Sequence, residues 1–202
     1  MSSSERMSCI CGICFFSGAS SNGTGGMTWA LDMLDKRRNR DGSTARASFY
    51  MNTMNGEQGD GESATLVKRA WRMALEKGHE IGNHTGSHMP VTTENLPALM
   101  DELKSINDQC RSHGIPCPIS FAYPGNAFTV EALPILRKSG IRFARRGAQP
   151  EYDYASGKGV AYEPGLDDPL LIPTTGEARP EWDLGRFRAA VRLGQGGRIA
   201  ML

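Results

Sequence analysis

The sequence predicts an α/β protein built from parallel βα units. Short apolar runs of strand length alternate along the 202 residues with amphipathic stretches of helix length. The 24 glycines and 11 prolines supply the tight turns that such short elements need. Units of this kind close into a barrel or open into a doubly wound sheet, and the alternation alone does not distinguish the two. No repeat or linker divides the chain, so we expect one domain over residues 1–202, with residues 1–7 disordered.

The first half of the chain is expected to hold three strands and two helices. Both helices follow from apolar residues spaced three and four apart, which also places Trp29 and Trp71 on faces that should lie in the core. Gly78 stands where the second helix should end. The expected elements are a strand at 8–16, a loop at 17–26, a helix at 27–36, a strand at 46–51, a helix at 64–77 and a strand at 79–82.

The second half continues the alternation. Thr93 is expected to cap the helix that begins there, and residues 146–180 read as a Gly- and Pro-rich loop with a short apolar run at 170–172. Loops at the carboxyl ends of strands hold the site in such folds, which points to 17–26, 83–92 and 123–128. The expected elements are helices at 93–112, 129–138 and 183–191 and strands at 119–123, 141–144 and 198–202.

Composition excludes several classes of protein. Lys and Arg number 23 against 22 Asp and Glu, a net charge of +1, so a nucleic-acid-binding face is not expected. No apolar run approaches the ~20 residues of a transmembrane helix. Five cysteines are an odd number and favour a reducing compartment over a disulfide framework. The run from Cys9 to Phe16 reads as a buried strand, with a weak export signal or a metal site as alternatives. No clear signal peptide is present, and both a cytoplasmic location and export to the cell envelope stay open.

Three of the four histidines fall between Gly78 and Pro90. His84 and His88 are four residues apart, a spacing with which two imidazoles can ligate one metal ion. The glycines within the segment favour a turn after a strand rather than a long helix. The alternative is that both histidines only hydrogen-bond the loop. His79, at the expected start of a strand, is interpreted as structural.

The stretch His79-Glu-Ile-Gly-Asn-His-Thr-Gly-Ser-His88 resembles the second motif of the polysaccharide deacetylases, the NodB-homology family or carbohydrate esterase family 4. Three further segments resemble strands of that family, in the same order and with similar spacing. They are Ala47-Ser-Phe-Tyr50, Phe121-Ala-Tyr-Pro-Gly125 and Gly140-Ile-Arg-Phe143. The resemblance runs over nearly the whole chain and implies a distorted (β/α) barrel.

The resemblance also implies a reaction, the metal-dependent hydrolysis of an N- or O-acetyl group on a glycan; some relatives act on small amides. The implied ligands of the divalent ion are His84, His88 and Asn22, the last in place of the family's aspartate. Zinc is expected, with cobalt and nickel as alternatives. Such an ion polarises the acetyl carbonyl and lowers the pKa of its water to about 7. The same resemblance implies that Tyr123, Pro124 and Gly125 form a wall of the substrate groove.

Two features depart from the family pattern. The family's first motif, Thr-Phe-Asp-Asp-Gly, aligns best with Ala19-Ser-Ser-Asn-Gly23 and alternatively with Phe16-Ser-Gly18, yet residues 7–31 contain no carboxylate. Ser21 therefore stands at the position of the general base, a role that serine does not fill at neutral pH. No histidine follows His113, so the family's late Leu-x-His motif, which supplies the general acid, is not found.

We therefore expect a barrel that is incomplete at its C-terminus, with an exposed edge at residues 198–202. Asp167, Asp168 and Asp183 are candidate stand-ins for the acid, but we interpret them as solvated loop and helix-start residues. Three hypotheses remain at this point. The chain is a metal-dependent carbohydrate deacetylase, a catalytically inactive barrel that binds a glycan or a metal, or a truncated fragment of a family member.

Overall fold

The computed structural model describes residues 25–39, 41–52, 62–153, 159–176 and 183–201. The expected strand at 8–16 and the disorder expected at 1–7 lie outside these residues. So do Ser21 and Asn22.

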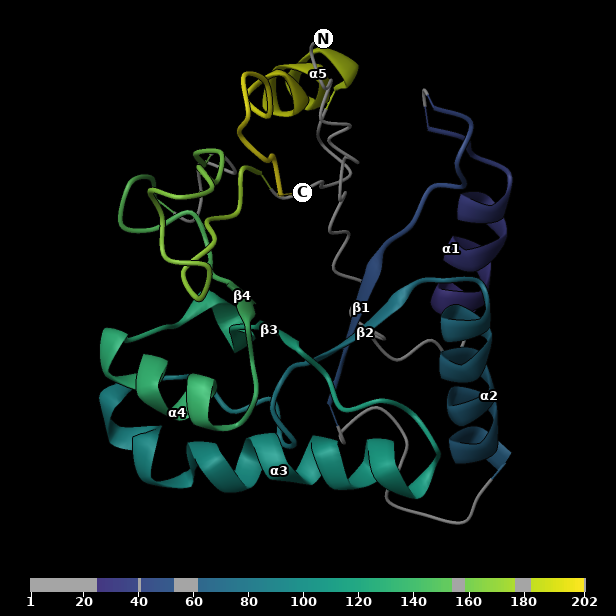
Figure 1. Cartoon of the computed structure of the whole chain (residues 1–202), viewed down its shortest axis with the longest axis vertical. Helices are drawn as coiled ribbons and strands as arrows, with labels where there is room; N and C mark the ends of the chain where they lie inside the picture. Colours follow the sequence, from purple (N-terminus) through teal and green to yellow (C-terminus); the bar gives the residue numbers. More distant parts are fainter. Residues whose placement is uncertain (1–24, 40, 53–61, 154–158, 177–182, 202) are drawn as a thin grey trace, which may run out of the picture.

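Four parallel strands form the central sheet (Figure 1), and they lie side by side in the order of the sequence. They are β1 (Ser48–Met51), β2 (Glu80–Asn83), β3 (Ser120–Ala122) and β4 (Phe143–Arg145). The sheet continues beyond β4, because Ile172 forms a parallel bridge with Arg145. Successive strands thus always advance in one direction, whereas a doubly wound sheet reverses its order. The winding is that of a barrel, and the described strands form an open part of one.

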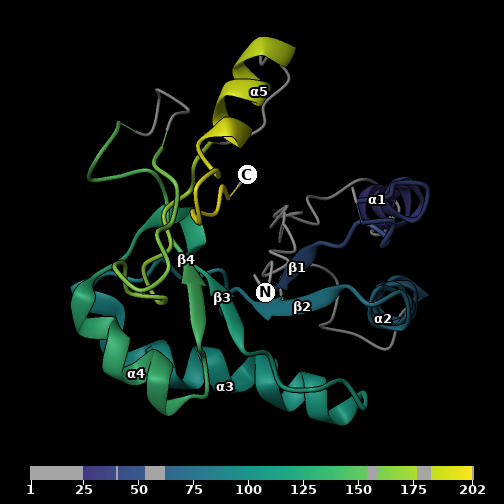
Figure 2. The same cartoon turned by 45° about the horizontal axis from the view of Figure 1, so that its top comes forward.

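Helices cover the outer face of this sheet. Figures 1 and 2 show α1 and α2 together on one flank and α3 and α4 together on the other, while α5 stands apart beyond the carboxyl end of β4. The helices are α1 (Gly25–Asp35), α2 (Glu62–Glu76), α3 (Leu96–Ser112), α4 (Leu133–Lys138) and α5 (Leu184–Arg192), with short 3-10 turns at Thr93–Asn95, Pro124–Asn126 and Val130–Ala132. None of the described helices is both long and apolar enough to cross a membrane.

The hydrophobic core lies between the strands and the helices. Alternate strand residues point outward into it, as the two-residue period of a strand requires. The first half of the core joins Phe49, Met51 and Ile81 to Trp71, Ala74 and Ile106. The second half joins Phe121, Tyr123 and Ala144 to Leu99, Leu103 and Leu136.

The inner face of the sheet is more polar than the outer face. A cavity of about 140 Å³ lies on it, with Ser48, Glu80, Ser120 and Arg145 among its lining residues. Gly82 faces the same side, where a Cβ atom would come within 2.4 Å of the Tyr50 ring. Glycine is therefore the residue that lets the two strands carry an aromatic side chain between them.

Two expectations about the helices are wrong. Trp29 is 61 % exposed, because Ala30, Leu31 and Leu34 define the buried face of α1. At about 100° per residue, Trp29 lies nearly opposite that face. Thr93 does not cap a helix; it is the first residue of a 3-10 turn whose N-cap, Thr92, makes no side-chain capping bond. A local pattern shows that a helix is present, but one apolar residue at its edge does not fix the buried side.

The strand expected at 198–202 is present only as isolated pairing. Ile199 bridges Tyr162 in antiparallel fashion, and Thr175 donates its N–H to the carbonyl oxygen of Met201 at 2.8 Å. Met201 is 8 % exposed. This part of the C-terminal segment is therefore covered by the loop before α5, so the exposed edge that we expected does not include Met201.

Candidate functional site

His84 follows β2 directly and is fully buried. Its backbone N–H donates to Met51 O at 2.9 Å, and its Nδ1 lies 2.7 Å from the carbonyl oxygen of Ala122 on β3. Because a carbonyl oxygen only accepts, Nδ1 carries a proton in this contact. The ring is thus held between two neighbouring strand ends, with its orientation set by backbone atoms.

The imidazole of His84 is neutral at pH 7. Burial lowers its pKa to about 4, against the opposing effect of the Ala122 hydrogen bond, and the nearby charges of His88 and Arg145 act in the same direction as burial. With the proton on Nδ1, the lone pair of the neutral ring is on Nε2. Metal-ligating histidines commonly have this arrangement, in which a carbonyl holds the nitrogen that does not bind the ion.

His88 lies next to His84 at the end of a short loop. Their ring centroids are 4.8 Å apart and the ring planes meet at 70°. Two imidazoles bound to one tetrahedral ion at ~2.0–2.1 Å have centroids separated by roughly 5 Å. His88 is half-buried, whereas His84 is buried. The pair therefore fits two positions of a zinc site.

Polar residues beside the two histidines fasten the loop to α3. Glu102 accepts two hydrogen bonds from Ser87, one from its backbone N–H at 2.7 Å and one from its hydroxyl at 2.9 Å. Asn83 accepts from the N–H of Thr85 at 2.9 Å and donates to Leu103 O at 3.0 Å. Asn83, Thr85 and Ser87 thus anchor the loop that carries the two histidines.

Backbone strain gathers around this site. In the described part of the chain three residues other than glycine have positive φ, Thr85, His88 and Asn126, each with φ of 60°. They lie in the loops after β2 and β3. Positive φ is energetically unfavourable for residues other than glycine. Such strain is found mostly at functional sites, where the surrounding structure holds it in place. The strain supports the strand ends as the functional end of the sheet.

The segment expected to form a groove wall is largely buried. Tyr123 is fully buried, its hydroxyl donates to Leu170 O at 3.0 Å, and burial raises the pKa of that hydroxyl above its ordinary value. Its side chain is therefore not available to a glycan. Pro124 is also buried, whereas Gly125 is exposed. A substrate contact from this segment stays a prediction, and it now rests on the backbone around Gly125.

Two inner-face residues were missed by the sequence analysis. Asn52 follows β1 and is buried, and its Oδ1 receives no hydrogen bond from the residues described. Arg145 ends β4 and is also buried; its Nη1 donates to Asn126 Oδ1 at 3.2 Å and to Thr174 Oγ1 at 2.7 Å. The signal that could have found Arg145 is the pair of arginines after an apolar strand, because alternation sends one to each face.

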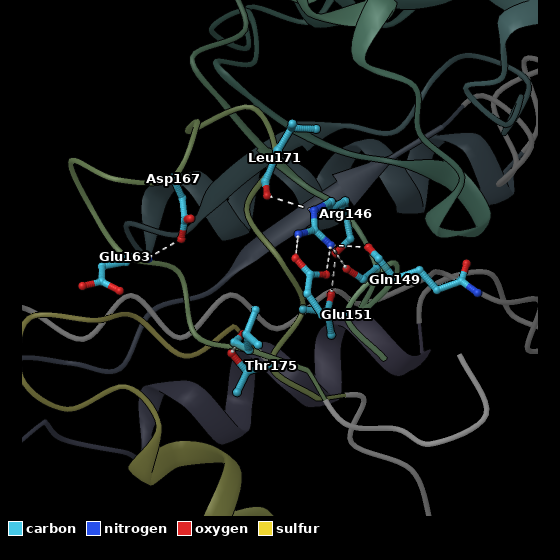
Figure 3. A network of polar contacts seen from close by, with 10 residues as sticks. Arg146, Gln149, Glu151, Glu163, Asp167, Leu171 and Thr175 are labelled. Atoms are coloured by element: carbon cyan, nitrogen blue, oxygen red, sulfur yellow. Dashed lines mark hydrogen bonds and ion pairs between the residues drawn. The ribbon is translucent and has the colours of Figure 1, made fainter. Parts of the chain in front are cut away.

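The three aspartates considered as stand-ins for an acid have local roles. Asp168 pairs with Arg137 at 2.7 Å, and Asp167 accepts from the N–H of Glu163 at 2.7 Å (Figure 3). Asp183 caps α5 by accepting from Arg186 N at 2.7 Å. These contacts agree with their interpretation as loop and helix-start residues.

Metal ligation by His84 and His88 stays a prediction. Among the described residues no group of three His, Cys, Asp or Glu residues could hold a metal ion. The remaining position assigned by resemblance, Asn22, and the base position, Ser21, lie outside those residues. His79, the other histidine of the motif, is buried in the core. Its Nδ1 accepts the N–H of Ala47 at 3.2 Å and its ring meets Phe49 edge-on, in agreement with a structural role.

Solved structures with a similar fold include deacetylases. The deacetylase PplD of Streptococcus pyogenes, in complex with acetate, is 17% identical with a TM-score of 0.61, and the match covers 82% of this chain and 65% of that one. A polysaccharide deacetylase from Bacillus cereus is 18% identical with a TM-score of 0.55, covering 83% and 48%. A 4-alpha-glucanotransferase from Thermococcus litoralis is 10% identical with a TM-score of 0.58, covering 90% and 29%.

At these identities the similarity establishes the fold and not the reaction, as the glucanotransferase makes plain. The chain spans less than two thirds of the length of each of these three structures. Among curated proteins, none matches the sequence significantly. The polysaccharide deacetylase family model matches residues 27–144, which contain β1 to β3, the first two residues of β4 and the histidine loop. More than half of the sequence is matched, and the chain belongs to the polysaccharide deacetylase family.

Proposed function

We propose that this protein binds an acetylated glycan, or a small amide, at the carboxyl ends of its strands, and that His84 and His88 hold a divalent ion there. Zinc is the expected ion, with cobalt and nickel as alternatives that imidazole also suits. The observation that carries the proposal is the state of His84, a neutral ring whose Nδ1 is engaged by Ala122 O and whose lone pair is on Nε2.

When bound, a divalent ion supplies polarisation of the acetyl carbonyl. The protein contributes the positions of the groups around it. Burial between two strand ends fixes His84, while the two hydrogen bonds from Ser87 to Glu102 fix the loop that carries His88. The exposed backbone at Gly125 lies at the end of the next strand, where a sugar ring could rest.

Catalysis by the chain as it stands is expected to be negligible. No carboxylate occurs in residues 7–31, where the family's metal-binding and basic aspartates are expected. A missing general base alone removes about 10²–10⁴-fold of rate. This sequence feature favours the second candidate function, a catalytically inactive barrel that keeps glycan or metal binding.

The metal part of the proposal is tested by calorimetric titration with zinc, cobalt and nickel. We expect about one zinc site per chain, weaker than a complete Asp-His-His set would give. His84→Ala and His88→Ala should each abolish it, and His113→Ala, at the end of α3, should leave it intact. Zinc binding that is unchanged in both loop variants would refute the assignment.

The catalytic part is tested by acetate release from acetylated chito-oligosaccharides and acetylxylan in the presence of zinc or cobalt. The chain should release acetate at the rate of the buffer control, and Ser21→Asp combined with Asn22→Asp should raise the rate. Turnover of about one per second by the unaltered chain, which is within the usual enzyme range, would show that other residues supply the base and the acid.

A further inference from the structure

Arg145 is a buried cation that forms no ion pair with any residue that the structure describes. It is 6 % exposed, and its guanidinium donates to two neutral oxygens, Asn126 Oδ1 and Thr174 Oγ1, both through Nη1. Its Nε is buried and donates to no acceptor among the residues described. The metal site proposed above makes no use of this group, and a second cation near the ion would oppose it.

The ion pairs of the described residues leave Arg145 out. Those pairs are Lys77 with Asp35, Arg111 with Asp108, Arg137 with Asp168, and Arg146 with Glu151. Glu80 lines the same inner cavity, but its carboxylate accepts from Ser48 Oγ at 2.5 Å. Glu80 begins β2 four residues before His84, roughly 13 Å along the strand. Among the described residues, therefore, no carboxylate forms an ion pair with Arg145, although Glu80 lines the same cavity.

A buried charge without a partner is costly. Removing an ion from water costs several kcal/mol unless an opposite charge or a full set of hydrogen bonds compensates. An anion bound at Arg145 would supply that compensation. With Nη1 engaged by the protein, Nε and Nη2 form the remaining edge of the guanidinium. Two parallel N–H groups on one planar edge match a carboxylate, which accepts them as a bidentate pair.

The groups around Arg145 are held in place before any ligand arrives. The hydroxyl of Thr174 donates to Arg146 O at 2.8 Å, which turns its lone pairs toward Arg145. Asn126 keeps a positive φ, and a Cβ on Gly147 would come within 2.6 Å of the Asn126 Cβ, so the two segments are in close contact. A preorganised donor loses less entropy on binding.

We propose that Arg145 binds a carboxylate of the ligand and gives this site a preference for acidic glycans, such as those that contain uronic acids. Arg145 lies opposite Ala122 in the sheet, and Ala122 O holds His84. The carboxylate subsite is therefore adjacent to the histidine pair. The inference rests on the proposed function in treating this end of the sheet as the glycan site. Carboxylate binding is measured without metal, so the two proposals can fail separately.

The test measures the binding of three probes to the metal-free chain by calorimetry and by the shift in melting temperature. Oligogalacturonate carries carboxylates on a glycan, sodium acetate is a free carboxylate, and chito-oligosaccharide is a neutral glycan. We expect oligogalacturonate to bind at millimolar concentration and chito-oligosaccharide to bind more weakly. Acetate distinguishes a site for any small carboxylate from one that also needs the sugar, and binding by either carboxylate supports the shared chemistry.

Two substitutions decide the role of Arg145. Arg145→Gln should weaken carboxylate binding roughly tenfold or more, and Arg145→Lys should weaken it too, because lysine keeps the charge and loses the planar fork. Arg142→Gln removes the same charge from an exposed position just before β4 and should have no effect. Equal affinity of Arg145→Gln and the unaltered chain, or no carboxylate binding by the unaltered chain, overturns the proposal. Arg145→Lys, which keeps the charge, preserves the test if Arg145→Gln fails to fold.

Discussion

Arg145 and Arg146 are consecutive and equally buried, 6 % and 7 % exposed, yet their charges are treated in opposite ways. Arg146 donates to both carboxylate oxygens of Glu151, at 2.8 and 2.5 Å, and to backbone carbonyls that include Leu171 O at 3.1 Å (Figure 3). Its guanidinium also lies 5.3 Å from the centre of the Phe128 ring. Arg145 has two neutral acceptors and no carboxylate in the described part of the chain.

The difference separates a structural arginine from a ligand-binding one. Alternation sends the two side chains to opposite faces of β4. The outer face is covered by a loop of this chain that brings its own carboxylate, so the network around Arg146 is closed and needs nothing else. The inner face borders a cavity that Arg145 lines together with the first residues of β1, β2 and β3, Ser48, Glu80 and Ser120. We propose that a carboxylate of the ligand completes the hydrogen bonding of Arg145.

The largest expected effect is on the closed network. Arg146→Met should lower the free energy of unfolding by about 3–5 kcal/mol, because it leaves Glu151 and several carbonyls without their donor. For a chain of this size that corresponds to a fall in melting temperature of roughly 6–20 °C. Calorimetry or circular dichroism measures it. Glu151→Gln, which keeps the shape of the side chain, should cost less, and an Arg146→Met variant as stable as the original would break the comparison.

Acid should lower the free energy of unfolding of the metal-free chain. The pKa of His84 is about 4 when folded against 6.5 ordinarily, so the unfolded chain binds a proton in this range that the folded chain does not. The contribution to stability is therefore complete above pH 6.5 and is lost as pH falls toward 4, on the order of 3 kcal/mol. Burial also lowers the pKa of His79, which acts in the same direction.

Urea unfolding at several pH values between 4 and 7 measures this loss. The His84→Gln variant has no imidazole at this position. The slope of its unfolding free energy against pH should therefore correspond to about one fewer proton taken up on unfolding. Arg145→Gln removes one of the nearby charges that lower the pKa of His84, and should slightly reduce the change of stability with pH. A stability that stays constant from pH 7 to pH 4 would contradict a neutral, buried His84.

A smaller effect is expected from the loop anchor. Glu102→Ala removes both acceptors of Ser87, which should cost only about 1 kcal/mol of stability because the contact is near solvent. Its effect on zinc should be larger, a loss of affinity of about 10–100-fold, since His88 would no longer be held in position. Asp101→Ala, an exposed neighbour on α3, is the matched control. Equal zinc affinity in the two variants would show that Glu102 does not position His88.

The smallest expected effect on stability is that of replacing Arg145, and it tests the comparison with Arg146 most directly. Arg145→Met should change the free energy of unfolding by no more than about 1 kcal/mol, or raise it, because it removes a buried charge that lacks a partner. The same substitution at the next residue is expected to be severe. Chemical unfolding of both variants measures this difference. A loss of unfolding free energy in Arg145→Met as large as in Arg146→Met would show that both arginines stabilise the fold.

Much of the local structure could be read from the sequence. The helices and strands that the structure describes lie within a few residues of their expected positions, because apolar periodicity is a local property of the chain. The motif that contains His84 and His88 was also found from sequence, and the structure places the two rings side by side; their role as metal ligands stays a prediction. The part of the site assigned to Ser21 and Asn22 stays a prediction.

Long-range contacts decided the rest. Alternation could not choose between a barrel and a doubly wound sheet, because both are built from the same βα unit; the parallel pairing of β1 to β4 in sequence order settled it. Tyr123 was expected at a groove and proved to be buried against Leu170, 47 residues away. The sequence by itself determined which residues form strands, helices and the histidine motif. Only the tertiary structure separated Arg145 from Arg146, because a two-residue period states that two side chains face opposite ways and says nothing about what covers either face.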